Sequence, residues 1–188
     1  MKLSRRSALT TAASAVAATA AASLETRLGA ADAASGSKGR VNHSVCKWCY
    51  PKVGLEELAI AGKAFGLRSI ELLEVGEIPT VQKHGLTCAI AGSHGFSTGF
   101  SNPDEWESCL KVLRERLDQC VEFGVKSVIT FTGMAKGRSK DEGKKNCIEG
   151  LRQIAGDAEK KGVTLCLEML NTRDSSHPMK GHPGYQGD

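Results

Sequence analysis

The sequence predicts an α/β fold, because short aliphatic runs alternate along the chain with longer stretches of helical periodicity. Five runs are expected to form strands, around residues 43–47, 69–74, 87–91, 126–132 and 163–169. They are aliphatic rather than strictly alternating, which is typical of parallel strands covered by helices. The second to fifth runs each follow a glycine and an aliphatic residue, and these glycines are Gly66, Gly85, Gly124 and Gly162. Each of them fits the left-handed residue that ends a helix, so right-handed crossovers should join a parallel sheet.

The helices are predicted between these strands, in chain order. Leu55–Phe65 carries apolar residues on one face, and the short link 76–83 has room for at most two helical turns. Across Pro103–Phe123 the apolar residues fall three or four apart, with Asn102 as the expected N-cap and the proline after it at the first helical position. A last long helix is predicted over Lys140–Lys161.

Residues 1–34 are predicted to form an export signal rather than folded structure. The pair Arg5-Arg6 lies in a short basic region, and a weakly apolar stretch, Thr10–Ala22, follows it. The low hydrophobicity favours a twin-arginine (Tat) signal, and an Ala-rich helical or disordered N-terminus is the alternative. We therefore expect export through the Tat pathway to a periplasmic or extracellular location. Residues 35–42 are predicted to be a linker and residues 43–188 the domain, without a membrane span.

The charge and the cysteines give little support to a nucleic-acid or redox function. The formal net charge of +4 comes partly from the export signal, and the rest of the chain is close to neutral, so no nucleic-acid partner is expected. All seven cysteines lie after residue 40, mostly at apolar positions where a thiol packs as a small hydrophobe. Cys46 and Cys49 form a C-x-x-C motif, but it lies in a strand-like segment rather than at a helix start. A redox or metal-binding function of this motif stays open, but buried or semi-buried thiols without such a function are favoured.

Polar residues at the ends of predicted strands are the candidates for chemistry, because reactive groups lie at the carboxyl ends of parallel strands in α/β folds. Glu168 follows the apolar Leu165-Cys166-Leu167, where a charge is costly unless it is paired, metal-bound or protonated. A structural ion pair with a lysine is the alternative. Glu71, in Ile70-Glu71-Leu72-Leu73, is likewise a charged residue in an apolar strand, so a functional role and a structural role are both open for it.

Histidines in two loops are weaker candidates. His94 lies in the Gly-rich segment 91–99, which lacks the Gly-Lys-Ser/Thr ending of a phosphate loop. A solvated or capping role is the alternative for His94. His182 lies in the polar C-terminal tail, where an ordinary surface histidine is the alternative.

Three segments together resemble a known family. Leu165–Asn171, followed by Met179–Asp188, is similar to hydroxypyruvate isomerase-like proteins, and Ser44–Tyr50 with the Glu71 strand fits their first two strands. These proteins belong to the xylose-isomerase-like TIM-barrel superfamily of sugar phosphate isomerases and epimerases. The resemblance covers about residues 43–188.

The resemblance implies a (β/α)8 barrel and an aldose-ketose type of proton transfer through an enediolate. It implies a divalent metal ion such as Mg or Mn, with Glu168 as both metal ligand and catalytic base. Glu71, His94, Asn171 and His182 would bind the substrate. That substrate would be a small sugar or a hydroxy-keto acid such as hydroxypyruvate, and a homo-oligomer is possible.

The length of the chain departs from this family. A complete barrel usually needs about 250 residues, and this chain stops in the loop after its fifth predicted strand. The family's other metal ligands and its second glutamate come from later strands. We therefore expect a barrel truncated after about five strands and catalytically incomplete as this chain. The alternatives are a non-catalytic remnant or binding module with a half-barrel fold, and an endonuclease-IV-like phosphodiesterase, against which the near-neutral charge argues.

Overall fold

The computed structural model describes residues 41–173 and 181–187. The predicted export signal, residues 1–34, and most of the predicted linker lie outside the described residues. None of the described helices is long and apolar enough to cross a membrane.

The strands are short and run parallel. β1 (Ser44–Cys46) pairs with β2 (Ser69–Glu71), and β3 (Ser127–Phe131) pairs with β4 (Thr164–Glu168). The segment between the two pairs, residues 87–91, contacts both of them through single parallel bridges, from Thr87 and Ala91. The described strands therefore form two parallel pairs that this segment links in chain order, and they do not close into a barrel.

The prediction of a regular strand at 87–91 is wrong in its extent. Leu72, directly after β2, has a φ of 57°, a left-handed conformation that ends an extended strand. The ladder between β2 and this segment is therefore interrupted, although the Leu72 amide still donates to the carbonyl of Ile90 at 3.0 Å. What remains of this third predicted strand is a set of isolated bridges.

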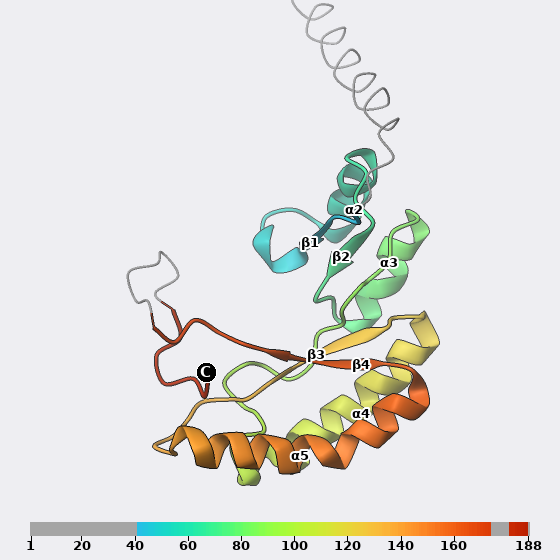
Figure 1. The fold of residues 1–188 in the computed structure, drawn as a ribbon. Coiled ribbons are helices and arrows are strands. Elements are labelled where there is room, and N and C mark those ends of the chain that lie inside the picture. The colour runs from blue at the N-terminus through green and yellow to red at the C-terminus, as the bar shows by residue number, and fades with distance from the viewer. Residues whose placement is uncertain (1–40, 174–180, 188) are drawn as a thin grey trace, which may run out of the picture.

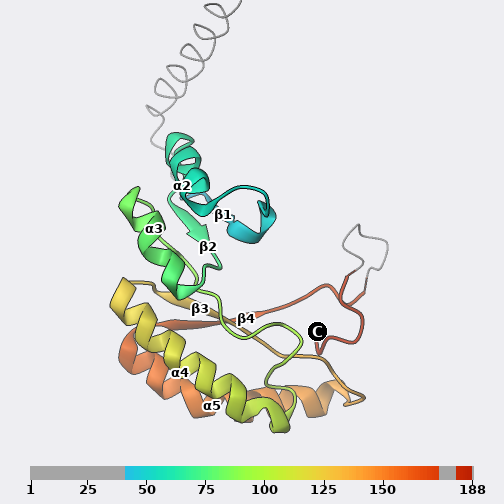
Figure 2. The same cartoon turned by 180° about the vertical axis from the view of Figure 1, so that it is seen from behind.

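Four helices cover the strands, close to the predicted ranges: α2 (Leu55–Ala64), α3 (Ile78–Lys83), α4 (Trp106–Phe123) and α5 (Lys140–Lys161). Short 3-10 turns precede two of them, η2 (Val75–Glu77) before α3 and η3 (Pro103–Glu105) before α4, and a third, η1 (Lys47–Cys49), follows β1. Figures 1 and 2 show α4 and α5 side by side on one face of β3 and β4. The opposite face of these strands carries no helix of the described chain.

The predicted helix ends are confirmed, and one predicted cap is not. Gly66, Gly85, Gly124 and Gly162 all have a positive φ between 63° and 79°. Ser139 caps α5 by accepting from the Glu142 amide. Asn102 makes no cap bond, because its side-chain amide instead donates to the Met134 carbonyl at 2.9 Å and to Glu105 at 3.2 Å.

The core lies between the sheet and the helices. Leu113 and Leu117 of α4 and Ile154 of α5 are fully buried, and they pack with Val128 of β3. Side chains on a strand alternate between its two faces. The neighbours of Val128 along β3 therefore point to the face that the helices leave uncovered.

Candidate functional site

A cavity of about 630 Å³ lies against the uncovered face of the sheet. Its walls come from the ends of the strands and from two loops, and they consist of Cys46, Trp48, Glu71, Leu72, Ile90, Phe96, Ile129, Phe131, Glu168, Leu170 and His182. Side chains from distant parts of the sequence therefore lie together in this cavity wall. Glu71, Glu168 and His182, three of the predicted site residues, are among them.

The two glutamates occupy matching positions in the sheet. Glu71 ends β2 opposite Cys46, and Glu168 ends β4 opposite Phe131. The Glu71 carboxylate accepts a hydrogen bond of 3.3 Å from the Ser69 hydroxyl. Both glutamate side chains are half-buried in the cavity wall. The chain therefore presents two carboxylates to one space from two non-adjacent strands.

The Cys46 thiol lies in the same cavity wall as these two carboxylates. Burial raises the pKa of Cys46, and the negative charges of Glu71 and Glu168 raise it further. Both charges are thus within electrostatic reach of one sulfur atom. A raised pKa keeps Cys46 protonated, the opposite of the thiolate that redox chemistry needs. Cys49 lies in the 3-10 turn η1 rather than in a strand, and both cysteines are free thiols.

His182 is held at the cavity by the C-terminal tail. Its backbone amide donates to the Asn171 carbonyl at 2.7 Å, and its ring lies edge-on to Phe96 with the centroids 4.8 Å apart. The buried Nδ1 atom of His182 has no hydrogen-bond partner within the described residues. A buried ring nitrogen without a partner is a place where a ligand hydroxyl or carbonyl can bind.

Asn171 and His94 lie outside the cavity wall. The Asn171 side-chain oxygen accepts from the Arg173 amide at 3.1 Å, so that Asn171 shapes the turn that holds His182. His94 packs edge-on between Phe100 and Phe131, and its Nε2 is 3.0 Å from the Thr130 hydroxyl. Burial lowers the pKa of His94, which keeps its imidazole neutral. The structure thus places His94 as a packed, hydrogen-bonded ring rather than a solvated one.

Tyr185 is a residue of this region to which sequence reasoning gave no role. Its hydroxyl accepts from the Thr132 amide at 3.0 Å and donates to the Glu168 carbonyl at 2.9 Å. Burial raises the pKa of Tyr185. Backbone bonds from Ala135 to Gly184 and from Gln186 to Gly133 hold the tail in place. Tyr185 therefore ties together the ends of β3 and β4 where Glu168 is carried, and no local pattern signals this contact.

The divalent metal implied by the resemblance does not fit the described residues by themselves. Carboxylate oxygen and imidazole nitrogen are suitable ligands. However, within residues 41–173 and 181–187 no group of three or more His, Cys, Asp or Glu side chains lies close enough to hold a metal ion. Glu168, Glu71 and His182 thus make no metal site alone, and we assign no step to a metal.

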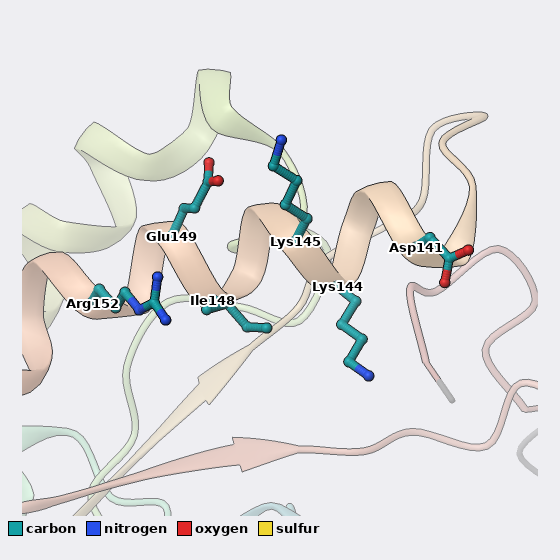
Figure 3. Close-up of a pocket in the computed structure, with 6 residues that line it drawn as sticks. All are labelled: Asp141, Lys144, Lys145, Ile148, Glu149 and Arg152. Atoms are coloured by element: carbon teal, nitrogen blue, oxygen red, sulfur yellow. The ribbon is translucent and has the colours of Figure 1, made fainter.

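A second hollow, of about 260 Å³, lies on the outer surface of α5 and is drawn in Figure 3. All six residues around it belong to this one helix: Asp141, Lys144, Lys145, Ile148, Glu149 and Arg152. Figure 3 shows their long side chains splayed to different sides of the helix. Mixed charges on an exposed helix are typical of a solvated surface. The strand-end cavity is therefore the candidate site.

Residues 65–181, more than half of the chain, match the family model of the xylose isomerase-like TIM barrel. The chain belongs to this family. The superfamily resemblance and the TIM-barrel-like fold predicted from the sequence are confirmed, whereas the narrower likeness to hydroxypyruvate isomerases stays a prediction.

Solved structures agree on the fold. A family 2 AP endonuclease from Brucella melitensis matches with a TM-score of 0.60 and 17% identity, over 78% of this chain and 59% of that one. A 3-keto-D-glucoside 4-epimerase from E. coli matches with a TM-score of 0.56 and 20% identity, over 68% and 56%. A D-psicose 3-epimerase solved with D-fructose matches with a TM-score of 0.54 and 16% identity, over 76% and 55%.

The TM-scores of these three matches show a shared fold. Their identities of 16–20% show no shared activity. The chain spans less than two thirds of the length of each of these three structures. Among curated protein sequences, none matches this chain.

Proposed function

We propose that this chain forms the substrate-binding and proton-transfer side of a sugar isomerase or epimerase, with Glu168 as the base. The observation that carries the proposal is the shared cavity of Glu168 and Glu71 at the carboxyl ends of β4 and β2. Two of the three matching structures described above are sugar epimerases by name, which supports the same class of reaction.

The chemistry follows from the two carboxylates. Glu168 takes the proton from the carbon beside the sugar carbonyl, and the electron pair of the C–H bond forms the carbon–carbon double bond of an enediolate. Return of that proton to the neighbouring carbon isomerises the sugar, provided that the proton of the hydroxyl on the first carbon passes to the former carbonyl oxygen. Delivery of a proton to the original carbon from the opposite side, by Glu71 in its protonated form, epimerises the sugar and leaves Glu168 protonated and Glu71 ionised. The unpartnered Nδ1 of His182 would bind a substrate oxygen.

The backbone around Glu168 supports this role. A base is effective only when its carboxylate is held within hydrogen-bond reach of the proton it removes. The Tyr185 hydroxyl fixes the Glu168 carbonyl, and the pairing with Phe131 fixes the register of β4. A divalent metal, as in the resemblance, would need ligands beyond those that the described residues bring together.

A second candidate function is a binding module that uses the same cavity without chemistry. The observation in its favour is that the described residues form no three-ligand metal cluster. The two candidates differ in one measurable property, since only the enzyme exchanges a carbon-bound proton of its ligand with solvent.

The test is hydrogen exchange in D2O, followed by proton NMR with D-fructose, D-psicose and hydroxypyruvate as substrates. The length of the chain predicts incomplete catalysis, but the two carboxylates in one cavity lead us to expect that the full chain exchanges the proton beside the carbonyl of at least one of these substrates, even if it does not complete the conversion. Glu168→Gln should slow the exchange by about 10²-fold or more, since a positioned base contributes about 10²–10⁴-fold. Glu149→Gln, on the exposed face of α5, is the matched control and should leave the rate unchanged. Full exchange by the Glu168→Gln variant would overturn the role of Glu168, and binding without exchange by the natural chain would favour the binding module.

A further inference from the structure

The C-x-x-C motif lies at the cavity wall, and the proposed function gives it no role. Cys46 ends β1 and is part of the wall, whereas Cys49 is the last residue of the 3-10 turn η1. All seven cysteines of the chain are among the described residues, and Cys49 is the only exposed one. A thiol on the surface and a thiol in the wall thus lie at the two ends of one short turn.

The backbone of this turn brings the two cysteines within bonding range. Cys46 is the N-cap of η1, so the pair is three residues apart across a single turn. The Tyr50 amide donates to the Lys47 carbonyl at 2.9 Å, which keeps the turn tight. The first and fourth residues of a tight turn have Cα atoms less than about 7 Å apart, and a disulfide joins Cα atoms about 4.4–6.8 Å apart. A disulfide between Cys46 and Cys49 can therefore form without refolding of the chain.

The two thiols differ in reactivity. Burial raises the pKa of Cys46, the charge of Glu71 raises it further, and Cys49 is near enough to contribute to the rise. Because the thiolate is the nucleophile, Cys46 is a poor choice for a first attack, whereas the exposed Cys49 can meet a disulfide from solution. Cys49 is therefore suited to be the attacking thiol, and Cys46 to be the resolving thiol.

Trp48 connects the two thiols to the cavity. It lies between them in sequence, borders the cavity and is 61% exposed. Burial raises the pKa of Cys46 and a hydrogen bond with the Trp48 side chain lowers it, so the indole and the thiol are in contact. A disulfide would draw the Cys46 sulfur toward Cys49 and close a ring through the Trp48 backbone.

We propose that Cys46 and Cys49 form a reversible dithiol–disulfide couple that reacts with small disulfides of the glutathione type, and that its oxidation state sets the position of Trp48 in the cavity wall. The Cys49 thiolate attacks one sulfur of the small disulfide RSSR and releases RS⁻. Cys46 then loses its proton and attacks the Cys49 sulfur of the mixed disulfide, which releases the second RS⁻. The two cysteines lose two electrons, RSSR is reduced, and the two cysteine protons end on two RSH.

Oxidation of the full chain in glutathione buffers tests the proposal. After acid quenching and alkylation in urea, peptide mass spectrometry should find a Cys46–Cys49 disulfide that forms with oxidised glutathione and disappears with reduced glutathione. The buried cysteines should remain thiols. In a ¹H–¹⁵N spectrum the Trp48 indole signal should differ between the two states. The signal of Trp106, which donates its indole N–H to the Phe100 carbonyl at 2.8 Å, should not.

Two serine variants test the division of roles. Cys46→Ser should accumulate a mixed disulfide of Cys49 with glutathione, because the resolving thiol is missing. Cys49→Ser should react with oxidised glutathione at least about tenfold more slowly, because Cys46 is half-buried and protonated. Cys166→Ser, at another half-buried thiol, is the matched control and should form the Cys46–Cys49 disulfide at the rate of the natural chain.

Two results would overturn the proposal. If the folded chain forms no Cys46–Cys49 disulfide in oxidised glutathione, the turn does not bring the two thiols together. If the disulfide forms and the Trp48 indole signal stays in place, the couple does not act on the cavity wall. Neither result bears on proton exchange by Glu168, so this couple and the proposed function are tested separately.

Discussion

The two faces of β3 and β4 differ in what they contact. On one face, Val128 and Thr130 are fully buried beneath the helix layer. On the other, Phe131 and Glu168 border the cavity, which is lined by strand ends, loops and Trp48 of η1 rather than by any described α-helix. The residues of the two faces alternate along the same strands, so a single sequence pattern supplies both. Packing against α4 and α5 thus holds the fold on one face, while the other face borders the cavity of the proposed site.

The largest expected effect is a difference in stability between a leucine in the core and a leucine in the cavity wall. Leu113 is fully buried beneath the sheet, and Leu170 is a half-buried residue of the cavity wall. Leu113→Ala should lower the free energy of unfolding by about 2–5 kcal/mol, because it leaves a void that the helices cannot fill. Leu170→Ala should cost under about 1 kcal/mol. Urea denaturation of both variants measures the difference, and similar losses would show that the two faces are not distinct.

Tyr185→Phe tests the link between the strand ends. The variant removes a hydroxyl that satisfies the Thr132 amide and the Glu168 carbonyl, so the free energy of unfolding should fall by about 1–3 kcal/mol. The Thr132 amide should also shift in an NMR spectrum, and its hydrogen exchange should accelerate. Tyr50→Phe, at a residue that is 40% exposed, is the control and should change stability little. An unchanged Thr132 amide would contradict the bridging role of Tyr185.

The smallest expected effect concerns the electrostatics of the cavity. Because burial and then the charges of Glu71 and Glu168 raise the pKa of Cys46, either Glu→Gln substitution should lower that pKa. More thiolate would then form at a given pH, and alkylation of Cys46 at pH 8 should become a few-fold faster. Peptide mass spectrometry separates Cys46 from Cys49, which is exposed.

Glu57→Gln is the control for a change of charge alone, since Glu57 lies on the exposed face of α2, and it should leave the alkylation rate of Cys46 unchanged. If Glu71→Gln speeds the alkylation of Cys46 and Glu168→Gln does not, the two carboxylates do not act on the same thiol. The shared cavity on which the proposed function depends would then be wrong.

The sequence alone determined the order of helices and strands and most of their ends. Helical periodicity and the glycines that close helices are local properties, so Gly124 and Gly162 indicate the ends of α4 and α5 without reference to any tertiary contact. Glu168 could be selected for a similar reason, since a charge at the end of an apolar strand is costly wherever the strand lies.

Only the tertiary structure decided which of the candidate residues meet. The left-handed Leu72 interrupts the predicted strand 87–91, and Tyr185 reaches Glu168 from 17 residues further along the chain. His94 turns to Thr130 while His182 reaches the cavity, although the two are the same residue type in similar loops. These outcomes depend on which segments pack together, and packing is set by contacts between residues far apart in sequence. The sequence thus determined the elements and the acidic candidates, and the fold brought Glu71, Glu168 and His182 to one cavity.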